Sequence, residues 1–245
     1  MTKTYQAHFE LRGSAYDRAM RKFPDARQAE FHQLIEAAEL ESGMVVADVP
    51  AGGGYLQGYL PAGCQWLAHE PCASFTNHGQ PSEQVVPLLP LPWSDGCIDV
   101  ALSLAGIHHI DDKRPLFREF YRVVRSGGRL VVSDVASASA VAHFLDGYVG
   151  ANNSTGHEGV FLDEWTLSEM TQAGWTIERV ETSHFHWVFA NRVDMAAFCH
   201  ELFDLRASTE ADTLQTVECT LGVDDLQAGG VGMRWSLMTI VAQRS

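Results

Sequence analysis

The stretch Val45-Val46-Ala47-Asp48-Val49-Pro50-Ala51-Gly52-Gly53-Gly54 decides the fold of this 245-residue chain. Its apolar start is typical of a buried parallel strand, and its three glycines predict a tight turn into a helix beginning near Tyr55. Glycines let backbone amides approach a ligand closely, and a helix start attracts an anionic group. Glu70 follows the next predicted strand, 65–69, where an acid can accept both hydroxyls of a ribose. The stretch therefore predicts a site for an adenosine-containing molecule.

Strand and helix patterns alternate through residues 44–135. The helical segments are short or amphipathic, and the apolar runs between them predict strands at 44–49, 65–69, 84–89, 98–104 and 129–135. Such alternation predicts an α/β fold with a doubly wound, seven-stranded, mostly parallel sheet and helices on both faces. Ligands of such sheets bind beyond the carboxyl ends of the strands.

The rest of the chain is expected to complete one domain over residues 1–245 around that core, 44–135. Residues 1–43 are expected to form a helical cover, because apolar residues recur at helical spacing from Phe31 to Ala38. Residues 136–160 are small, polar and irregular, which predicts a lid or substrate loop. Residues 161–245 are expected to give the last strands (175–189 and 232–242), two helices (163–173 and 193–205) and the substrate pocket.

Composition narrows the class of partner. The net charge is −14, and a surface this acidic disfavours nucleic acid and anionic membranes. The sequence has no apolar run of membrane-spanning length and no signal-peptide pattern, and its five cysteines form no Cys-x-x-Cys pair. We therefore expect a cytoplasmic protein that acts on a small molecule, and the oligomeric state stays open.

Two common nucleotide-binding motifs are absent around Gly52. A dinucleotide fingerprint needs Gly-x-Gly-x-x-Gly, and both possible registers lack the third glycine, with Tyr55 or Gln57 in its place. A nucleoside triphosphate loop needs Gly-Lys-Ser/Thr, which does not occur in the sequence. Both ligand classes are therefore disfavoured.

Four motifs in order resemble class I S-adenosylmethionine-dependent methyltransferases, in particular the small-molecule, type 11-like branch. The first is the Asp48–Gly54 turn, although Pro50 replaces the first glycine of the family's motif. The others are Leu-Pro-Trp-Ser-Asp-Gly-Cys-Ile-Asp-Val at 91–100, Ile-His-His-Ile-Asp-Asp at 107–112, and the helix and Ser-Gly-Gly turn at 117–130. The resemblance spans about 45–134 and implies a Rossmann-like methyltransferase fold.

The resemblance also implies S-adenosyl-L-methionine as the cofactor. It places the methionine end against the glycine turn, the ribose on Glu70, and the positive sulfonium near Tyr16, since aromatic faces attract cations. One arginine among Arg12, Arg18 and Arg21 is a candidate partner for the methionine carboxylate. The expected cofactor-binding residues are Tyr16, Asp48, Ala51, Gly52, Gly54, Glu70, Pro71, Leu88, Leu104 and His109. The family often has an adenine-binding acid before Leu-Pro, and here Pro87, Leu88 and Leu89 stand instead.

The candidate catalytic residues are His108 and His109. They follow strand 98–104 at the ligand edge of the sheet, and histidine is suited to removing a proton from an acceptor near neutral pH. The alternative is that these histidines serve packing or line the cofactor site. The expected substrate residues are His143, Phe161, Trp165, His184 and His186. A His-x-His pair at 184 and 186 has no supporting ligand motif, so no metal is predicted.

The favoured function is methyl transfer from S-adenosylmethionine to an O, N or C atom of a small metabolite. Two alternatives stay open. One is a non-catalytic, cofactor-binding regulatory subunit, which the departures at Pro50 and 87–89 motivate. The other is an enzyme that uses the same cofactor for chemistry other than methylation.

Overall fold

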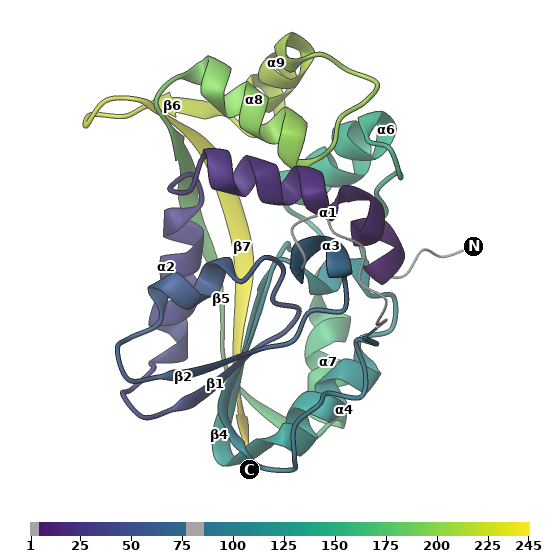
Figure 1. Ribbon diagram of the computed structural model, residues 1–245, viewed down its shortest axis with the longest axis vertical. Coiled ribbons are helices and arrows are strands. Elements are labelled where there is room, and N and C mark those ends of the chain that lie inside the picture. The colour runs from purple at the N-terminus through teal and green to yellow at the C-terminus, as the bar shows by residue number, and fades with distance from the viewer. Residues whose placement is uncertain (1–4, 77–85) are drawn as a thin grey trace.

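The structure is a computed structural model that describes residues 5–76 and 86–245 (Figure 1). The predicted strand 84–89 lies partly outside the described residues, and residues 86–89 form no strand.

A seven-stranded mixed sheet forms the centre of the molecule. Its order is β2-β1-β3-β4-β7-β5, with β6 paired to β7. The strands are β1 (Val45–Asp48), β2 (Gln65–Ala68), β3 (Ile98–Leu104), β4 (Val124–Asp134), β5 (Trp175–Phe189), β6 (Val223–Asp225) and β7 (Val231–Arg244). Strands β1 to β4 pair in parallel, and β7 runs antiparallel to its neighbours. The predicted α/β architecture is confirmed, although β6 rather than 84–89 supplies the seventh strand described.

Helices cover both faces of the sheet. The longer helices are α1 (Tyr5–Lys22), α2 (Gln28–Ala38), α4 (Arg114–Val123), α7 (Glu164–Gln172), α8 (Arg192–Leu202) and α9 (Glu210–Thr220). The short ones are η1 (Tyr55–Tyr59), α3 (Ala73–Thr76), η2 (Ile107–His109), α5 (Ala140–Phe144), η3 (Leu145–Val149) and α6 (Gly150–Asn152). Figure 1 shows α2 on one side of the sheet and α4 with α7 on the other. Each face has its own core, the first around Phe31 and Leu34 of α2 and the second around Phe117 and Phe120 of α4.

Strands β5 and β7 form a long antiparallel pair whose far end supports a helical cap. The pairing continues from Trp175 opposite Arg244 to Phe189 opposite Val231. Trp187 and Trp235 stack at this end, with ring centroids 4.1 Å apart, and helix α8 packs against it through Phe198. Figure 1 shows α8, α9 and α1 at this end, above the carboxyl ends of β1 and β3. The cap therefore lies on the side of the sheet where ligands are expected.

Three parts of the fold differ from the sequence prediction. The predicted irregular loop 136–160 is helical over 140–152, where α5, η3 and α6 follow one another. Its start is fixed by Ser139, whose side chain accepts a hydrogen bond from the Ala142 amide and caps α5. The Ser126-Gly127-Gly128 turn lies within β4 instead of before it. Helix α9 and strand β6 were not predicted, because Glu210–Thr220 carries only two buried residues and β6 has three residues.

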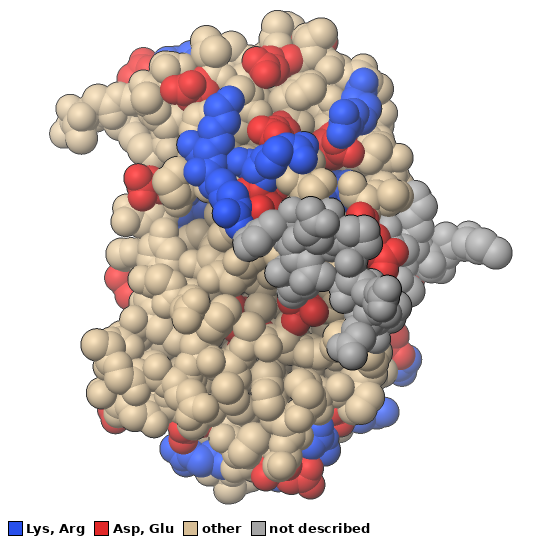
Figure 2. Space-filling view, in the orientation of Figure 1, with Lys and Arg blue, Asp and Glu red and all other residues tan. Residues whose placement is uncertain are grey.

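The described residues include no helix with the length and apolarity needed to cross a membrane. Figure 2 shows Lys and Arg side chains gathered over α1, where Arg18, Arg21 and Lys22 are exposed. Two of them are paired, because Arg18 contacts Glu201 at 2.8 Å and Arg21 contacts Asp17 at 2.6 Å. This surface therefore gives little evidence for a site that binds a polyanion.

Candidate cofactor and acceptor site

The glycine turn after β1 opens toward a cavity. Gly52 has φ +53°, and a Cβ built on it would have no atom within 4 Å. Its backbone therefore borders open space, and the left-handed φ disfavours other residues. The Ala51 amide donates to the His69 carbonyl and the Gly54 amide to the Ala51 carbonyl, so hydrogen bonds hold the turn in place. Pro50 thus leaves the predicted glycine cradle intact.

Glu70, at the end of β2, points toward this turn. Its Oε2 accepts hydrogen bonds from the Gly52 amide at 2.8 Å and the Tyr5 hydroxyl at 2.9 Å, and its Oε1 accepts from the Cys72 amide at 2.8 Å. The carboxylate is therefore at the predicted position beside the glycines. Tyr5 belongs to α1, so this helix reaches across the cleft to the same acid.

Asp48 ends β1 beneath the cavity and is buried. Burial raises the pKa of Asp48 to about 7. The hydrogen bond from the Trp66 indole lowers this pKa, and the charge of Glu70 raises it by a smaller amount. Near neutral pH this carboxyl is therefore partly protonated and can donate as well as accept a hydrogen bond.

The first cavity is lined by five of the ten predicted cofactor residues. Its walls include Tyr16, Asp48, Ala51, Gly52 and Leu104. Concave sites that combine apolar walls with a few polar groups are common ligand sites.

Other predicted cofactor residues lie around the first cavity. Gly54 turns away from it, since an added Cβ would meet Trp66 at 3.0 Å. Pro71 accepts a hydrogen bond from Gln6 of α1, and the Leu88 carbonyl lies 3.0 Å from His69 Nε2. These contacts fix the surrounding loops.

A second cavity adjoins the first. Phe9, Tyr16, Arg27 and Ala105 line both cavities, so the two cavities are neighbours that share part of their walls. The further walls are mostly apolar and come from the lid, the cap and the sheet: Val135, Leu145, Trp187, Leu202, Phe203 and Trp235. His108, His109 and His157 give the second cavity a polar side.

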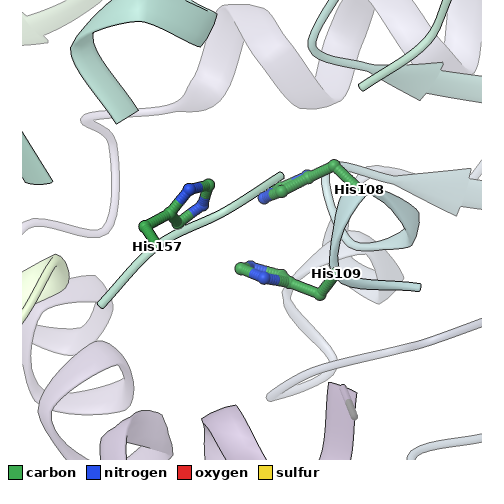
Figure 3. Close-up of side chains that lie close together, drawn as sticks. All are labelled: His108, His109 and His157. Carbon is green, nitrogen blue, oxygen red and sulfur yellow. The ribbon is translucent and has the colours of Figure 1, made fainter. Parts of the chain in front are cut away.

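The three histidines form a compact buried cluster (Figure 3). Their ring nitrogens all lie within 4.8 Å of one another, and Figure 3 shows the rings pointing toward a common centre. His108 and His109 belong to η2, directly after β3, and His157 comes from the segment after α6. The Val160 amide donates to the His108 carbonyl at 2.8 Å, which ties the two segments together.

His108 is oriented by a carboxylate from the neighbouring strand. Its Nδ1 lies 2.6 Å from Asp134 Oδ1, and its backbone amide donates to Asp134 Oδ2 at 3.1 Å. Burial alone would raise the pKa of Asp134, but the charge and hydrogen bonds of His108 outweigh it and lower the pKa. The carboxylate therefore stays ionised and accepts the Nδ1 proton of His108, and in the neutral imidazole this pairing leaves Nε2 as the acceptor nitrogen.

A buried ion pair that the sequence did not reveal stands between the two cavities. Arg27 Nη2 lies 2.5 Å from Glu30 Oε1, and the Trp187 indole donates to Glu30 Oε2 at 2.7 Å. Arg27 also donates to the Tyr16 hydroxyl. The sequence did not reveal this network, because an arginine and a glutamate three residues apart are the usual arrangement of an ion pair on the exposed face of a helix.

The predicted substrate residues lie in different parts of the structure. Phe161 is buried and stacks on the rings of His108 and His157, with centroids 5.8 and 6.1 Å away. Trp165 is 78 % exposed on α7, so its predicted position in the pocket is wrong. His143 is exposed, with Nδ1 bonded to the Ser139 carbonyl, and the lid instead contributes His157.

The predicted pair on β5 also lies away from both cavities. His184 borders a surface groove with Thr182 and Trp235, and His186 Nε2 bonds Asp224 at 2.8 Å. Neither residue lines the two cavities described above. The chain pattern does not show how far along β5 the cap begins.

Comparison with known proteins matches residues 47–132 to the family model "Methyltransferase domain". A curated relative, O-methyltransferase resE of Aspergillus sclerotiorum, is 30 % identical over 86 residues, which are 33 % of this chain and 33 % of that protein. The chain spans from 23 % to 51 % of the length of the curated relatives that it matches.

Solved structures share the fold over nearly the whole chain. A S-adenosylmethionine-dependent methyltransferase of Thermotoga maritima, described as a possible histamine N-methyltransferase, has a TM-score of 0.61 at 17 % identity, covering 98 % of this chain and 100 % of that one. The [4+2]-cyclase SpnF has a TM-score of 0.63 at 16 % identity, covering 98 % and 97 %. The predicted resemblance and the Rossmann-like methyltransferase fold are thus confirmed.

Proposed function

We propose, on the premise that this chain carries a class I S-adenosylmethionine-dependent methyltransferase domain, that it methylates a hydroxyl group of a small molecule. The observation that carries the proposal is the pair of adjoining cavities. One is bordered by the glycine turn, whose Gly52 amide donates to Glu70, and the other is lined by His108, which pairs with Asp134. The two reactants can be held side by side there, which is the main requirement of a displacement reaction.

The residues of the first cavity fit S-adenosylmethionine, which supplies an electrophilic methyl group on a sulfonium when bound. The open space beside Gly52 leaves room for close approach to the backbone, and Glu70 can accept hydroxyl hydrogen bonds. The ring of Tyr16 lines both cavities, so it stands where a cationic sulfur between them would be attracted to it.

The second cavity supplies the group that moves a proton. His108 holds its Nδ1 proton against Asp134, so Nε2 is the nitrogen that accepts a proton from the acceptor hydroxyl. Trp187, Phe203 and Trp235 exclude water and hold an apolar acceptor. The net charge of −14 disfavours nucleic acid as the acceptor, and we propose that the protein works in the cytoplasm on a metabolite.

The test combines binding with product analysis. We expect S-adenosylhomocysteine to bind in calorimetry, and Glu70→Gln to weaken binding at least tenfold, because the ribose loses a charged acceptor. Glu39→Gln is the control, since Glu39 lies on the surface at the end of α2 and pairs with Arg129. Incubation with acceptor mixtures should then give a product heavier by one methylene unit.

The outcomes separate the alternatives. Absence of measurable heat at millimolar S-adenosylhomocysteine would contradict the proposal. Cofactor binding without any product across acceptor classes would favour a regulatory subunit. A product of unchanged mass would favour chemistry other than methylation.

A second candidate chemistry is activation of the acceptor by a metal ion at the three histidines. Imidazole nitrogens are common ligands of divalent transition metals, and His108 and His157 each bond a carboxylate through Nδ1, as metal-binding histidines often do. Their nitrogens spread over as much as 4.8 Å, which is wider than the roughly 3.4 Å between ligands of a tetrahedral zinc site. Metal analysis of the purified protein and activity after chelation separate the two. Full activity without metal supports the proton-transfer role, and restoration by zinc alone overturns it.

A further inference from the structure

Arg12 on α1 is a buried cation whose side chain is not fully paired. It is 4 % exposed and lines the second cavity. Its Nε and Nη1 are buried and have no hydrogen-bond partner among the described residues. Leaving a guanidinium desolvated in this way is costly, so the site is incomplete without an anion.

The nearby acids are already engaged. Asp204 accepts from the Ser154 hydroxyl at 2.6 Å and lies 2.5 Å from Arg206 Nε. Glu30 is bonded by Arg27 and Trp187. Burial lowers the pKa of Arg12 to about 10, while the charge of Asp204 opposes the shift, so the guanidinium stays charged at neutral pH. The second cavity therefore has an unneutralised positive side.

The two unpaired donors point to the charge of the ligand. Nε and Nη1 lie on different edges of the guanidinium, because the Nε–H points to the Nη2 side, so an anion accepts a charge-assisted hydrogen bond from one donor or the other. A phosphate would need more donors than Arg12 leaves unpaired, which favours a singly charged carboxylate, and the other walls are mainly aromatic and aliphatic. The cavity thus combines a carboxylate partner with surfaces for an aromatic body.

We propose that the acceptor is an aromatic carboxylic acid with a hydroxyl group, whose carboxylate is bound by Arg12 while its hydroxyl faces His108. This inference rests on the proposed function and specifies its substrate class. Arg12 acts as a binding residue, and the rings of Trp187 and Trp235 hold the aromatic body between the two polar ends.

The test measures binding without turnover, in the presence of S-adenosylhomocysteine. The probes are benzoate, 4-hydroxycinnamate and 6-hydroxy-2-naphthoate, each compared with its carboxamide by calorimetry. At least one acid should bind ten or more times as tightly as its amide. Arg12→Met should remove this preference, and Arg12→Lys should keep part of it. Arg114→Met, at an exposed position on α4 where the arginine pairs with Asp112, should change neither affinity.

Protein stability provides the readout that separates binding from a structural role. Replacing a buried, incompletely paired cation by an apolar side chain should leave the melting temperature of Arg12→Met at or above that of the wild type. A fall of several degrees, no acid preference with any probe, or an acid preference that survives Arg12→Met would each overturn the inference. Acid-selective binding without methylated product would instead contradict only the proposed function.

Discussion

His108 Nδ1 and Asp134 Oδ1 lie 2.6 Å apart, although 26 residues separate them in the chain. Strands β3 and β4 pair in parallel with Leu104 opposite Ser133, so the residues that follow each strand meet at one edge of the sheet. This register places the Asp134 carboxylate against Nδ1 of His108, which lines the second cavity. The pair is therefore a consequence of the sheet topology.

Asp134→Asn should reduce kcat by roughly 10²–10⁴-fold, the range that a general base contributes. The amide no longer fixes the proton on Nδ1, so Nε2 is less available as an acceptor. Steady-state kinetics measures the change in kcat. Calorimetry with S-adenosylhomocysteine is the control, and the affinity of the variant should stay within twofold of that of the wild type. The same change at Asp146, which bonds His157 at 2.7 Å, should affect kcat much less. A larger loss in Asp146→Asn would assign the proton transfer to His157.

Asp48 should make the protein less stable as the pH rises. Its pKa is about 7 in the folded chain and about 3.9 when unfolded, so between these values the folded state binds the extra proton. The free energy of unfolding therefore falls by roughly 1.4 kcal/mol per pH unit across that window. Urea unfolding of the ligand-free protein at pH 5 to 8 measures the slope. Asp48→Asn should flatten it, whereas Asp25→Asn, at an exposed position, should not.

Glu30→Gln should destabilise the protein by about 3–5 kcal/mol, because it leaves the buried Arg27 without its counter-charge. Glu30 is fully buried and Arg27 is 4 % exposed. Chemical denaturation gives the difference in unfolding free energy. Glu201→Gln breaks the exposed contact with Arg18 and should cost less than about 1 kcal/mol. Equal losses in the two variants would refute the idea that burial makes the Arg27 pair strong.

Gly52→Ala should weaken S-adenosylhomocysteine binding at least tenfold. The added methyl group would project into the cavity, and the φ of +53° would become strained by roughly 1–2 kcal/mol. Gly58→Ala is a matched control, because an added Cβ there also has no atom within 4 Å but the backbone lies in η1. Calorimetry of both variants tests the prediction, and an unchanged affinity in Gly52→Ala would place the ligand elsewhere.

The sequence predicted the glycine turn, Glu70 and both histidines of η2, because these residues directly follow strands whose apolar runs are easy to recognise. It did not reveal Asp134 as the partner of His108, since pairing register is a property of two distant segments. The Arg27–Glu30 pair was also missed, and Arg12 was predicted only as one of three candidate partners for the methionine carboxylate. Their roles depend on how the lid, α1 and α2 pack against the cap, and local periodicity does not specify that packing.

Helix α1 contributes Phe9 and Tyr16 to the walls of both cavities. The same helix therefore forms part of both binding surfaces, and a ligand that shifted α1 on entering one cavity would also change the walls of the other. Thermodynamic linkage makes such an effect reciprocal. If the bound nucleoside raises the affinity for the acceptor by some factor, the bound acceptor raises the affinity for the nucleoside by the same factor.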